Sequence, residues 1–428
     1  MRLVLFVCIA SPAYGQDWQQ ITPNGASPQA RSHAAAIYDP EAHRIVLFGG
    51  RGEHGFLNDV WALDLGGLEW TELTAQGAAA PPPRFTPAGA YDPERRQMLI
   101  WSGQGDGFFN DVWAFDLVES SWSRLLPTTD AEPNDRYGVA AVYDPVAGHL
   151  VTFAGFTDQG RFDDTWRFDV ENRAWTEIGL GSGHPGKRCL HTAVYDAFRH
   201  RMIMFGGQRS GPLDDLWALD MSTDTWMELV PPPPRPSGRY FAATVYDAEN
   251  DRMLMFGGNQ GSQILTDELW SFSLENEAWQ LLSPTGSAPS PREGAVAVYV
   301  SDENRMIVLG GRNSSYLDDV WSFDLRSTST VGVQEEVPSA VIQLHPNYPN
   351  PFAAATSIVY EVPRAMSIEV MIYDMLGREV QVVAQGAHAA GRHVETWNTR
   401  RVVPGTYVCR LRGGGVAKQR LLVVTDRP

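Results

Sequence analysis

The sequence predicts an all-β protein that is built largely from one repeated four-strand unit. A frame that begins with an arginine recurs at spacings of 53, 52, 52, 51 and 53 residues. Its copies begin at Arg31, Arg84, Arg136, Arg188, Arg239 and Arg292. Each copy contains two apolar runs, a pair of small residues such as Gly-Gly, an acidic turn and a tryptophan. A period of about 50 residues with four strand-like segments is typical of a β-propeller blade. The array therefore predicts a six-bladed β-propeller.

Four strand-like segments follow one another in each unit. The first consists of small residues, as in 34–39 and 139–144, and small side chains suit the innermost strand, where blades converge. The second is wholly apolar, as in 44–50 and 252–258, which indicates burial on both faces. The third contains an acidic residue two positions before a tryptophan, and the fourth opens on a second tryptophan. Proline-rich stretches then lead to the next unit, where they prevent stray strand pairing.

The sixth unit lacks its second tryptophan, and the N-terminus offers the missing strand. Trp321 is present, but no fourth-strand tryptophan follows it in that unit. Trp18 precedes Arg31 by 13 residues, and Trp70 precedes Arg84 by 14. We therefore expect the segment around Trp18 to complete the last blade and close a propeller over residues 16–326. Such a closure removes an open sheet edge.

The repeated features resemble the kelch repeat. The resemblance is carried by the Gly-Gly pairs, the [Asn/Asp]-Asp-x-Trp segments and the two spaced tryptophans, over about three quarters of the chain. Units two and three depart from it, with Trp101-Ser102-Gly103 and Phe153-Ala154-Gly155 in place of the Gly-Gly pair. The resemblance implies a kelch-type β-propeller, a class in which the mouth of the central channel is a common recognition surface.

Both ends of the chain carry predicted export features. Residues 1–15 contain Arg2, an eight-residue apolar run and the small residues Ala13 and Gly15, which predicts a secretory signal peptide. The run is too short to span a bilayer, so no transmembrane segment is expected. A linker is expected at residues 327–342. In residues 343–428, apolar alternation interrupted by Gly and Pro predicts a small immunoglobulin-like β-sandwich.

The C-terminal segment is similar to the type A (Por) sorting domain of the bacterial type IX secretion system. The residues that carry this similarity include Tyr348, Pro349, Asn350, Pro351, Phe352, Gly377, Arg378, Gly405 and Tyr407. The similarity implies that residues 343–428 engage the type IX secretion machinery. It also implies a protein that is secreted or displayed on the outer cell surface, and it leaves open whether the mature protein is anchored or released.

Composition and motif content argue against several functional classes. Residues 340–428 carry ten basic and six acidic side chains, so the chain's net charge of −17 places −21 on residues 1–339. An acidic body of this kind disfavours nucleic acid and anionic membrane surfaces as partners. The three cysteines make no disulfide framework, and the histidines form no HxH or HExxH cluster. No Gly-rich phosphate loop is present, and we predict no metal, no cofactor and no catalytic residue.

Candidate ligand-binding residues gather at one end of the predicted channel, which we name face A. The second-to-third-strand loops and the blade-to-blade loops share this face. The candidates are the six leading arginines, together with Phe85, Tyr137 and Tyr240, which directly follow three of them. Guanidinium and aromatic groups suit carboxylate, peptide or sugar ligands.

The same arginines have a structural interpretation. The acidic turn supplies a carboxylate at the same phase of every repeat, namely Asp59, Asp111, Asp164, Asp215, Asp267 and Asp319. We favour pairing within each blade for the arginines as a set, because packing demands repetition in every blade. Ligand contact by a subset stays open. Cys189 and His191 occur only in the fourth unit, and core packing is favoured for His191.

No unique acid, base, nucleophile or metal set is evident, which favours binding over catalysis. The leading hypothesis is a secreted or surface-displayed monomer that binds a glycan, peptide or protein at face A. The alternative is a kelch-related carbohydrate-active enzyme, oxidase- or epimerase-like, that uses the same channel mouth. A surface scaffold without a defined ligand is the third possibility.

Overall fold

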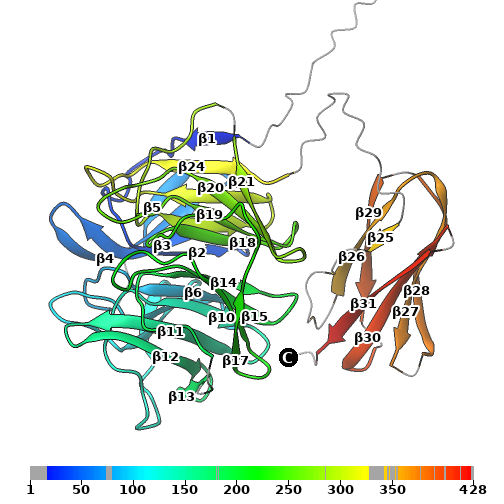
Figure 1. Ribbon diagram of the computed structural model, residues 1–428, viewed down its shortest axis with the longest axis horizontal. Coiled ribbons are helices and arrows are strands. Elements are labelled where there is room, and N and C mark those ends of the chain that lie inside the picture. The colour runs from blue at the N-terminus through cyan, green and yellow to red at the C-terminus, as the bar shows by residue number, and fades with distance from the viewer. Residues whose placement is uncertain are drawn as a thin grey trace, which may run out of the picture. The chain divides into compact units, whose positions relative to one another are not determined.

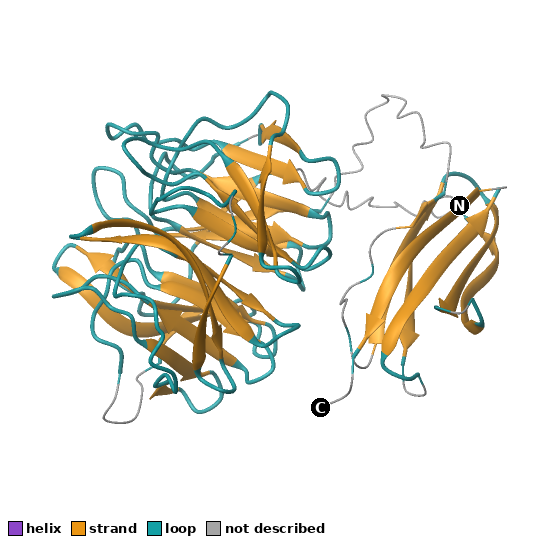
Figure 2. Cartoon of the chain, turned by 60° about the horizontal axis from the view of Figure 1, so that its bottom comes forward, coloured by secondary structure: helices purple, strands orange, loops and turns teal. Residues whose placement is uncertain are grey.

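The chain divides into two compact units, Met1–Thr330 and Val331–Pro428. The computed structural model describes residues 17–73, 80–179, 181, 183–284, 286–326, 342–344, 347, 352, 355–375, 377–389, 391–399, 402–414 and 416–425. The predicted signal peptide and almost all of the predicted linker lie outside these residues. Every regular element in the described ranges is a strand (Figure 2). This confirms the all-β prediction, and no described helix is long and apolar enough to cross a membrane.

The first unit contains six four-stranded antiparallel sheets (Figure 1). The first three sheets are β2 (Ala35–Asp39), β3 (Arg44–Gly52), β4 (Gly55–Asp64) and β5 (Glu69–Glu72); β6 (Ala88–Asp92), β7 (Gln97–Trp101), β8 (Val112–Asp116) and β9 (Ser121–Arg124); and β10 (Ala140–Asp144), β11 (His149–Thr157), β12 (Gly160–Asp169) and β13 (Ala174–Ile178). The next two are β14 (Thr192–Asp196), β15 (Arg201–Phe205), β16 (Leu216–Asp220) and β17 (Thr225–Leu229); and β18 (Ala243–Asp247), β19 (Arg252–Phe256), β20 (Leu269–Ser273) and β21 (Ala278–Leu282). The sixth is β22 (Val296–Val300), β23 (Arg305–Leu309), β24 (Val320–Asp324) and β1 (Trp18–Ile21).

The sheets form a closed ring of blades. The first strands contact one another in the cycle β2, β6, β10, β14, β18, β22 and back to β2. The sixth sheet is completed by β1, which pairs with β24 so that Trp18 lies opposite Phe323. The prediction that the N-terminal strand closes the last blade is therefore confirmed. This closure ties both ends of the propeller into one sheet.

The core lies between neighbouring blades, because each second strand is apolar on both faces. In β15, Met202 and Met204 pack toward the third blade, whereas Ile203 and Phe205 pack against Met253 and other residues of the fifth. All four of these β15 side chains are at most 1% exposed. Full burial of an apolar side chain of this size stabilises the fold by about 1.5–3 kcal/mol, so this repeated strand is the main source of cohesion between blades.

Two hairpins extend farther than the others. β3 and β4 have 9 and 10 residues, as do β11 and β12, whereas β15 and β16 have 5 each. Each long hairpin resumes its pairing after a register shift, at Phe48/Gly50 in the first blade and at Phe153/Gly155 in the third. The additional pairs place side chains of both hairpins beside the channel mouth.

The second unit is a β-sandwich. One sheet contains β25 (Gln343–Leu344), β26 (Ala355–Val362) and β29 (Gly391–Asn398), and the other contains β28 (Glu379–His388), β27 (Met366–Asp374), β30 (Gly405–Gly413) and β31 (Val416–Val424). Both sheets contribute to one core, for example Tyr360 and Trp397 from the first and Ile372 and Leu411 from the second. Two antiparallel sheets that share a core in this way are the defining feature of a sandwich.

The sorting-motif residues that are described take structural places in this sandwich. Phe352 and Tyr407 both pack against Trp397, with ring centroids 5.5 Å away in each case. Gly377 has a φ of +80°, and Arg378 beside it binds Asp374 across the turn with Nε 2.6 Å from Oδ2. Gly405 begins β30. Tyr348, Pro349, Asn350 and Pro351 lie outside the described residues.

Candidate ligand-binding site at the channel mouth

The six arginines that begin the repeats are buried inside the blades, with at most 4% of each residue exposed. Arg188 shows the pattern: Nη1 and Nη2 donate to Asp215 at 2.6 and 2.7 Å, and Nη1 also donates to the carbonyl of Gly206 at 3.1 Å. Its Nε donates to the carbonyl of Gly186 at 3.0 Å. The equivalent pairs are Arg31 with Asp59, Arg84 with Asp111, Arg136 with Asp164, Arg239 with Glu268, and Arg292 with Asp319. We name these six arginines the clamp arginines.

Each clamp carboxylate also accepts a hydrogen bond from the tryptophan two residues later. In the second blade, Trp113 donates to Asp111 at 2.6 Å, and alternate residues of a strand share a face, which explains the spacing. Burial alone would raise the pKa of these carboxyl groups, but the arginine and indole donors lower the pKa overall for Asp59, Asp111, Asp215, Glu268 and Asp319. The carboxylates are therefore held in the charged, accepting form.

The fifth blade corrects one expected residue. Asp267, placed in the aspartate series from the sequence, is exposed, and Glu268 takes the clamp position. Trp270 donates to Glu268 at 2.9 Å, as the other tryptophans do to their aspartates. The longer side chain changes the contact, because Arg239 reaches it through Nη2 alone, at 2.6 Å.

The geometry supports the structural interpretation of the arginines. Four of the five N–H groups of Arg84 have partners within its own blade, and its side chain has no exposed surface. A ligand could reach such a group only by breaking a bidentate ion pair, which is among the stronger hydrogen-bonded arrangements in proteins. The clamp arginines are consequently not part of the site that we describe next.

Two other positions of each repeat surround the channel mouth. They are the residue directly after the clamp arginine and the residue directly after the small pair, and they form one isolated bridge in each blade. The six bridges are Ser32 with Arg51, Phe85 with Gln104, Tyr137 with Phe156, Cys189 with Gln208, Tyr240 with Asn259, and Glu293 with Arg312. We name these twelve residues the mouth ring. Phe85, Tyr137 and Tyr240, the aromatic candidates from the sequence, belong to it.

The mouth ring differs in kind from the clamp, because its side chains change from blade to blade. The flanking arginine is constant, but the next residue is Ser, Phe, Tyr, Cys, Tyr or Glu. The positions after the small pairs were missed as individual candidates, although their loops were expected at the mouth. The signal that could have identified them is this variation at a fixed place in an otherwise regular frame.

A central ring of residues lies next along the chain, two positions after each clamp arginine. Its members are His33, Thr86, Gly138, Leu190, Phe241 and Gly294, and all six have a positive φ between 49° and 69°. Neighbours bond directly around the ring, as when the backbone N–H groups of His33 and Gly294 donate to the carbonyls of Gly294 and Phe241 at 2.7 and 3.0 Å. Residues that bond to both neighbouring blades in this way must surround the propeller axis.

Side chains of the central ring fill the space beside the mouth. The His33 ring lies 4.0 Å from Phe241 and 4.6 Å from Phe85, between ring centroids. Burial, with Arg312 and Arg51 adding to it, lowers the pKa of His33 to about 3, so this imidazole is neutral at physiological pH. A Cβ on Gly294 would lie 2.4 Å from the His33 ring, which is why glycine is required there.

One half of the mouth is aromatic. Phe56, Phe85, Tyr137 and Phe156 follow one another from the first blade to the third, with centroid separations of 6.5, 6.2 and 5.6 Å. We name these four rings the aromatic arc. All four are half-buried, and Phe108 stacks nearly parallel on Tyr137, at 5.8 Å and 7°. The arc therefore presents a mainly apolar surface in a partly solvated position.

An arginine lies at each end of the aromatic arc. Arg51 lies over Phe56 at 5.5 Å, and Arg161 lies over Phe156 at 5.2 Å. The two pairs are cross-strand neighbours in the two long hairpins, with opposite order along the chain. Arg161 also donates to the side-chain oxygen of Gln208 at 3.1 Å. Cation–π contact of this kind holds a guanidinium in place while its edge remains able to bind an anion.

The other half of the mouth is polar. Glu293 is buried, accepts from Nδ2 of Asn259 at 2.8 Å and pairs with Nε of Arg312 at 3.1 Å. Burial, together with Glu293, raises the pKa of Tyr240. The mouth thus combines aromatic faces with amide, carboxylate, phenol and guanidinium groups.

Cys189 and His191 contribute little to this surface. Cys189 belongs to the mouth ring but is only 1% exposed, and burial raises its pKa against the lowering effect of Arg161. His191 is buried with its ring centroid 5.5 Å from that of Phe153. Burial, with Arg188 adding to it, lowers the pKa of His191 to about 3. This packing agrees with the core role that was favoured from the sequence.

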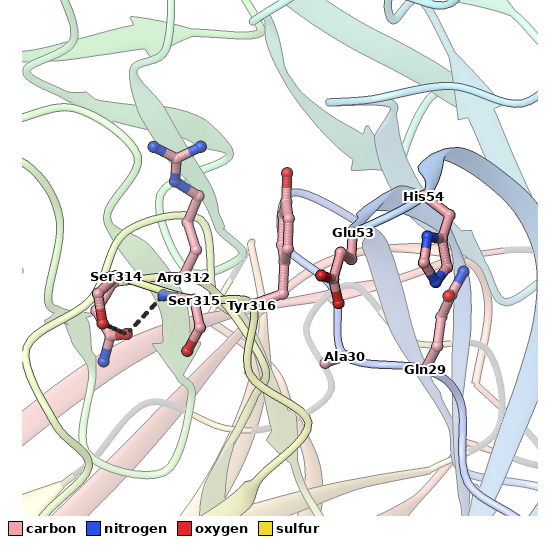
Figure 3. Close-up of a pocket in the computed structure, with 9 residues that line it drawn as sticks. Gln29, Ala30, Glu53, His54, Arg312, Ser314, Ser315 and Tyr316 are labelled. Atoms are coloured by element: carbon pink, nitrogen blue, oxygen red, sulfur yellow. Dashed lines mark hydrogen bonds between the residues drawn. The ribbon is translucent and has the colours of Figure 1, made fainter.

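A pocket of about 590 Å³ adjoins the polar half, between loops of the sixth and first blades. It is lined in part by Gln29, Glu53, His54, Arg312 and Tyr316, and in the view of Figure 3 Tyr316 lies between Arg312 and Glu53. The pocket shares Arg312 with the mouth ring, so it extends the polar half outward. Within the described ranges, no group of three or more His, Cys, Asp or Glu side chains could hold a metal ion.

The closed ring of sheets and the variable mouth define a β-propeller with a candidate ligand site at one end of its channel. Residues 13–185, 64–249 and 181–341 match the KLHDC2/KLHL20/DRC7 kelch-repeats domain in overlapping copies. The chain therefore belongs to the kelch-repeat family, and residues 347–425 match the secretion system C-terminal sorting domain. Both family resemblances predicted from the sequence are confirmed, and the sorting domain points to secretion or the outer surface.

Curated relatives match part of the chain at low identity. Acyl-CoA-binding domain-containing protein 5 of Arabidopsis thaliana is 26% identical over 71% of this chain and 48% of its own length. Leucine-zipper-like transcriptional regulator 1 of Homo sapiens is 28% identical over 61% of this chain and 31% of its own length. Putative adagio-like protein 2 of Oryza sativa subsp. japonica is 27% identical over 69% of this chain and 49% of its own length. The chain thus spans a third to a half of the length of these relatives.

Proposed function

We propose that the propeller, residues 16–326, is a recognition module that binds a glycan, peptide or protein ligand at the mouth ring. The observation that carries the proposal is the contrast within each repeat: the clamp arginine is constant, and the mouth-ring residues beside it differ between blades. A position that differs between blades and keeps a partly exposed side chain is not fixed by packing of the scaffold. Half-buried aromatic and guanidinium groups at this position are the residue types enriched at binding hot spots.

We also propose how the module reaches its ligand. A signal peptide at residues 1–15 would direct the chain across the inner membrane, and residues 343–428, after a linker at 327–342, would engage the type IX secretion machinery. The sorting-domain match at 347–425 supports the second step. Deletion of 343–428 is expected to retain the protein in the periplasm, as measured by cell fractionation. Unchanged surface display of the shortened protein would contradict the proposal.

The binding proposal is tested by screening the full chain for ligands and measuring affinity in variants of the aromatic arc. Phe85→Ala and Tyr137→Ala are expected to weaken binding about fivefold or more, since truncation of an interface aromatic that matters for binding costs over about 1 kcal/mol. Phe198→Ala is the matched control. Phe198 is also half-buried against a tyrosine, Tyr246 at 6.2 Å, but lies in the first-to-second-strand turn at the opposite end of its blade. Equal affinity in all three variants would overturn the proposed site.

A further inference from the structure

The ends of the aromatic arc carry cations that the propeller itself does not neutralise. Neither Arg51 nor Arg161 has a carboxylate partner among the described residues, whereas the six clamp arginines all do. Residues 1–339 carry a net charge of −21, so acidic side chains are abundant, and this field disfavours long polyanions such as nucleic acid; an anionic ligand must be held by local ion pairs. Two guanidinium groups held on phenylalanine faces, at either end of one surface, therefore point to an anionic ligand that reaches both of them.

The backbone of the mouth is not available to that ligand. In all six bridges of the mouth ring, the two residues exchange both of their backbone hydrogen bonds, at 2.8–3.1 Å. An extended peptide that binds by strand addition needs free backbone donors and acceptors on its receptor. Recognition by the mouth ring must instead use side chains, which disfavours a peptide bound to these residues in that way.

The side chains that remain suit a polyhydroxylated ligand. The faces of the aromatic arc carry partial negative charge and attract the polarised C–H groups on the flat side of a sugar ring. Gln104 and Gln208 add half-buried amide groups to the mouth ring, whereas Asn259 and Glu293 are buried and bond to each other. Amides both donate and accept hydrogen bonds, which matches hydroxyl groups that do both.

We infer that the ligand is an acidic oligosaccharide whose sugar rings lie along the aromatic arc and whose carboxylates pair with Arg51 and Arg161. This inference rests on the proposed function, since it names the ligand class of the same site. Uronic acid units supply both features, because each has a sugar face and a carboxylate. The arc spans three blades, so a ligand of several units is needed to reach both arginines.

Titration calorimetry on the full chain tests the inference with defined probes: oligosaccharides of galacturonate, mannuronate and glucuronate, and neutral oligosaccharides of equal length. We expect at least one acidic probe to bind about tenfold or more tightly than its neutral counterpart, with an affinity that falls as salt rises. Arg51→Gln and Arg161→Gln should each weaken the acidic probe by roughly tenfold to a hundredfold, since each removes a charge-assisted contact. Binding of neutral probes should not change.

Arg209→Gln is the matched control, because Arg209 is an exposed arginine of the same loop class and lacks a carboxylate partner in the described part of the chain. It should leave the affinity unchanged, and thermal unfolding of each variant confirms its fold. Equal affinity for acidic and neutral probes, or binding of an acidic peptide with no bound oligosaccharide, would overturn the inference. In both cases, weaker binding of the ligand by Phe85→Ala would still support the proposed site. If Phe85→Ala bound the ligand as tightly as the wild-type chain, the proposed site would be overturned as well.

Discussion

Adjacent positions of the same repeat have opposite physical roles in this propeller. Arg84 is fully buried, is bound on four of its N–H groups, and has an equivalent in every blade. Phe85, the next residue, is half-buried, contacts rings of other blades and has no common equivalent. The comparison teaches that chemical reactivity alone is a poor guide to function in a repeat protein. Constancy across copies indicates scaffold, and variation indicates a candidate site where the varying side chain also remains partly exposed.

Substitution of a clamp arginine should lower the free energy of unfolding more than substitution in the central ring or the mouth ring. Arg84→Ala removes a bidentate partner and leaves Asp111, which is only 9% exposed, without its counter-charge. We expect the free energy of unfolding to fall by about 3–5 kcal/mol, the usual cost of breaking a buried pair. Urea denaturation of Arg84→Ala beside Phe85→Ala, for which about 1 kcal/mol is expected, makes the comparison direct. If both variants lost a similar free energy of unfolding, the distinction between the clamp arginines and the mouth ring would not hold.

The central ring should tolerate change almost as poorly as the clamp. Gly294→Ala places a Cβ at a φ of +62° and within 2.4 Å of the His33 ring. The strain of a left-handed backbone at a non-glycine residue and the clash with the His33 ring together predict that the free energy of unfolding falls by about 2–4 kcal/mol. Gly148→Ala is the control, because Gly148 has a φ of +70° but no atom nearer than 3.9 Å to its Cβ position. Gly148→Ala therefore measures the backbone strain alone. If it lowered the free energy of unfolding as much as Gly294→Ala does, packing around His33 would be unimportant.

His191 shows that a residue found in one blade alone can belong to the scaffold. The pKa of His191 is about 3 in the fold, well below its ordinary value of 6.5, so only the unfolded chain takes up a proton between these values. Stability from this neutral histidine is present at pH 7 and is lost as pH falls below 6.5. Between pH 7 and pH 5.5 the wild-type chain should lose about 1.4 kcal/mol more than His191→Leu, from the 1.36 kcal/mol value of one pKa unit. Parallel pH profiles in urea denaturation would argue against this burial.

Much of the scaffold could be predicted from the sequence, because it depends on local pattern repeated six times. The arginine frame, the apolar second strands and the isolated Trp18 are enough to predict the ring and its closure. The location of the mouth follows from the direction of the strands. The sequence also favours pairing of the clamp arginines with the acidic turns, because each recurs at the same position of every repeat.

The details of the site depend on contacts that no local pattern contains. The clamp residue of the fifth blade is an exception, because Glu268, and not Asp267, stands two positions before its tryptophan, so spacing alone identifies it. The contacts of Arg51 with Phe56 and of Arg161 with Phe156 depend on the two longer hairpins, in which strand pairing resumes after a register shift. The aromatic arc joins residues about 20 to 50 positions apart through the ring geometry of a propeller. Such contacts arise from tertiary structure alone.

Substitution of the half-buried members of the mouth ring should change the stability of the propeller least. The side chain of Gln104 is half-buried, and its backbone pairs with Phe85 through main-chain atoms that any residue supplies. Gln104→Ala is therefore expected to alter the free energy of unfolding by no more than about 0.5 kcal/mol, as surface substitutions usually do. Urea denaturation of this variant beside Arg84→Ala measures the full range between the two kinds of position. A loss of several kcal/mol from Gln104→Ala would mean that the mouth ring is scaffold after all, and that its variation between blades reflects packing and not recognition.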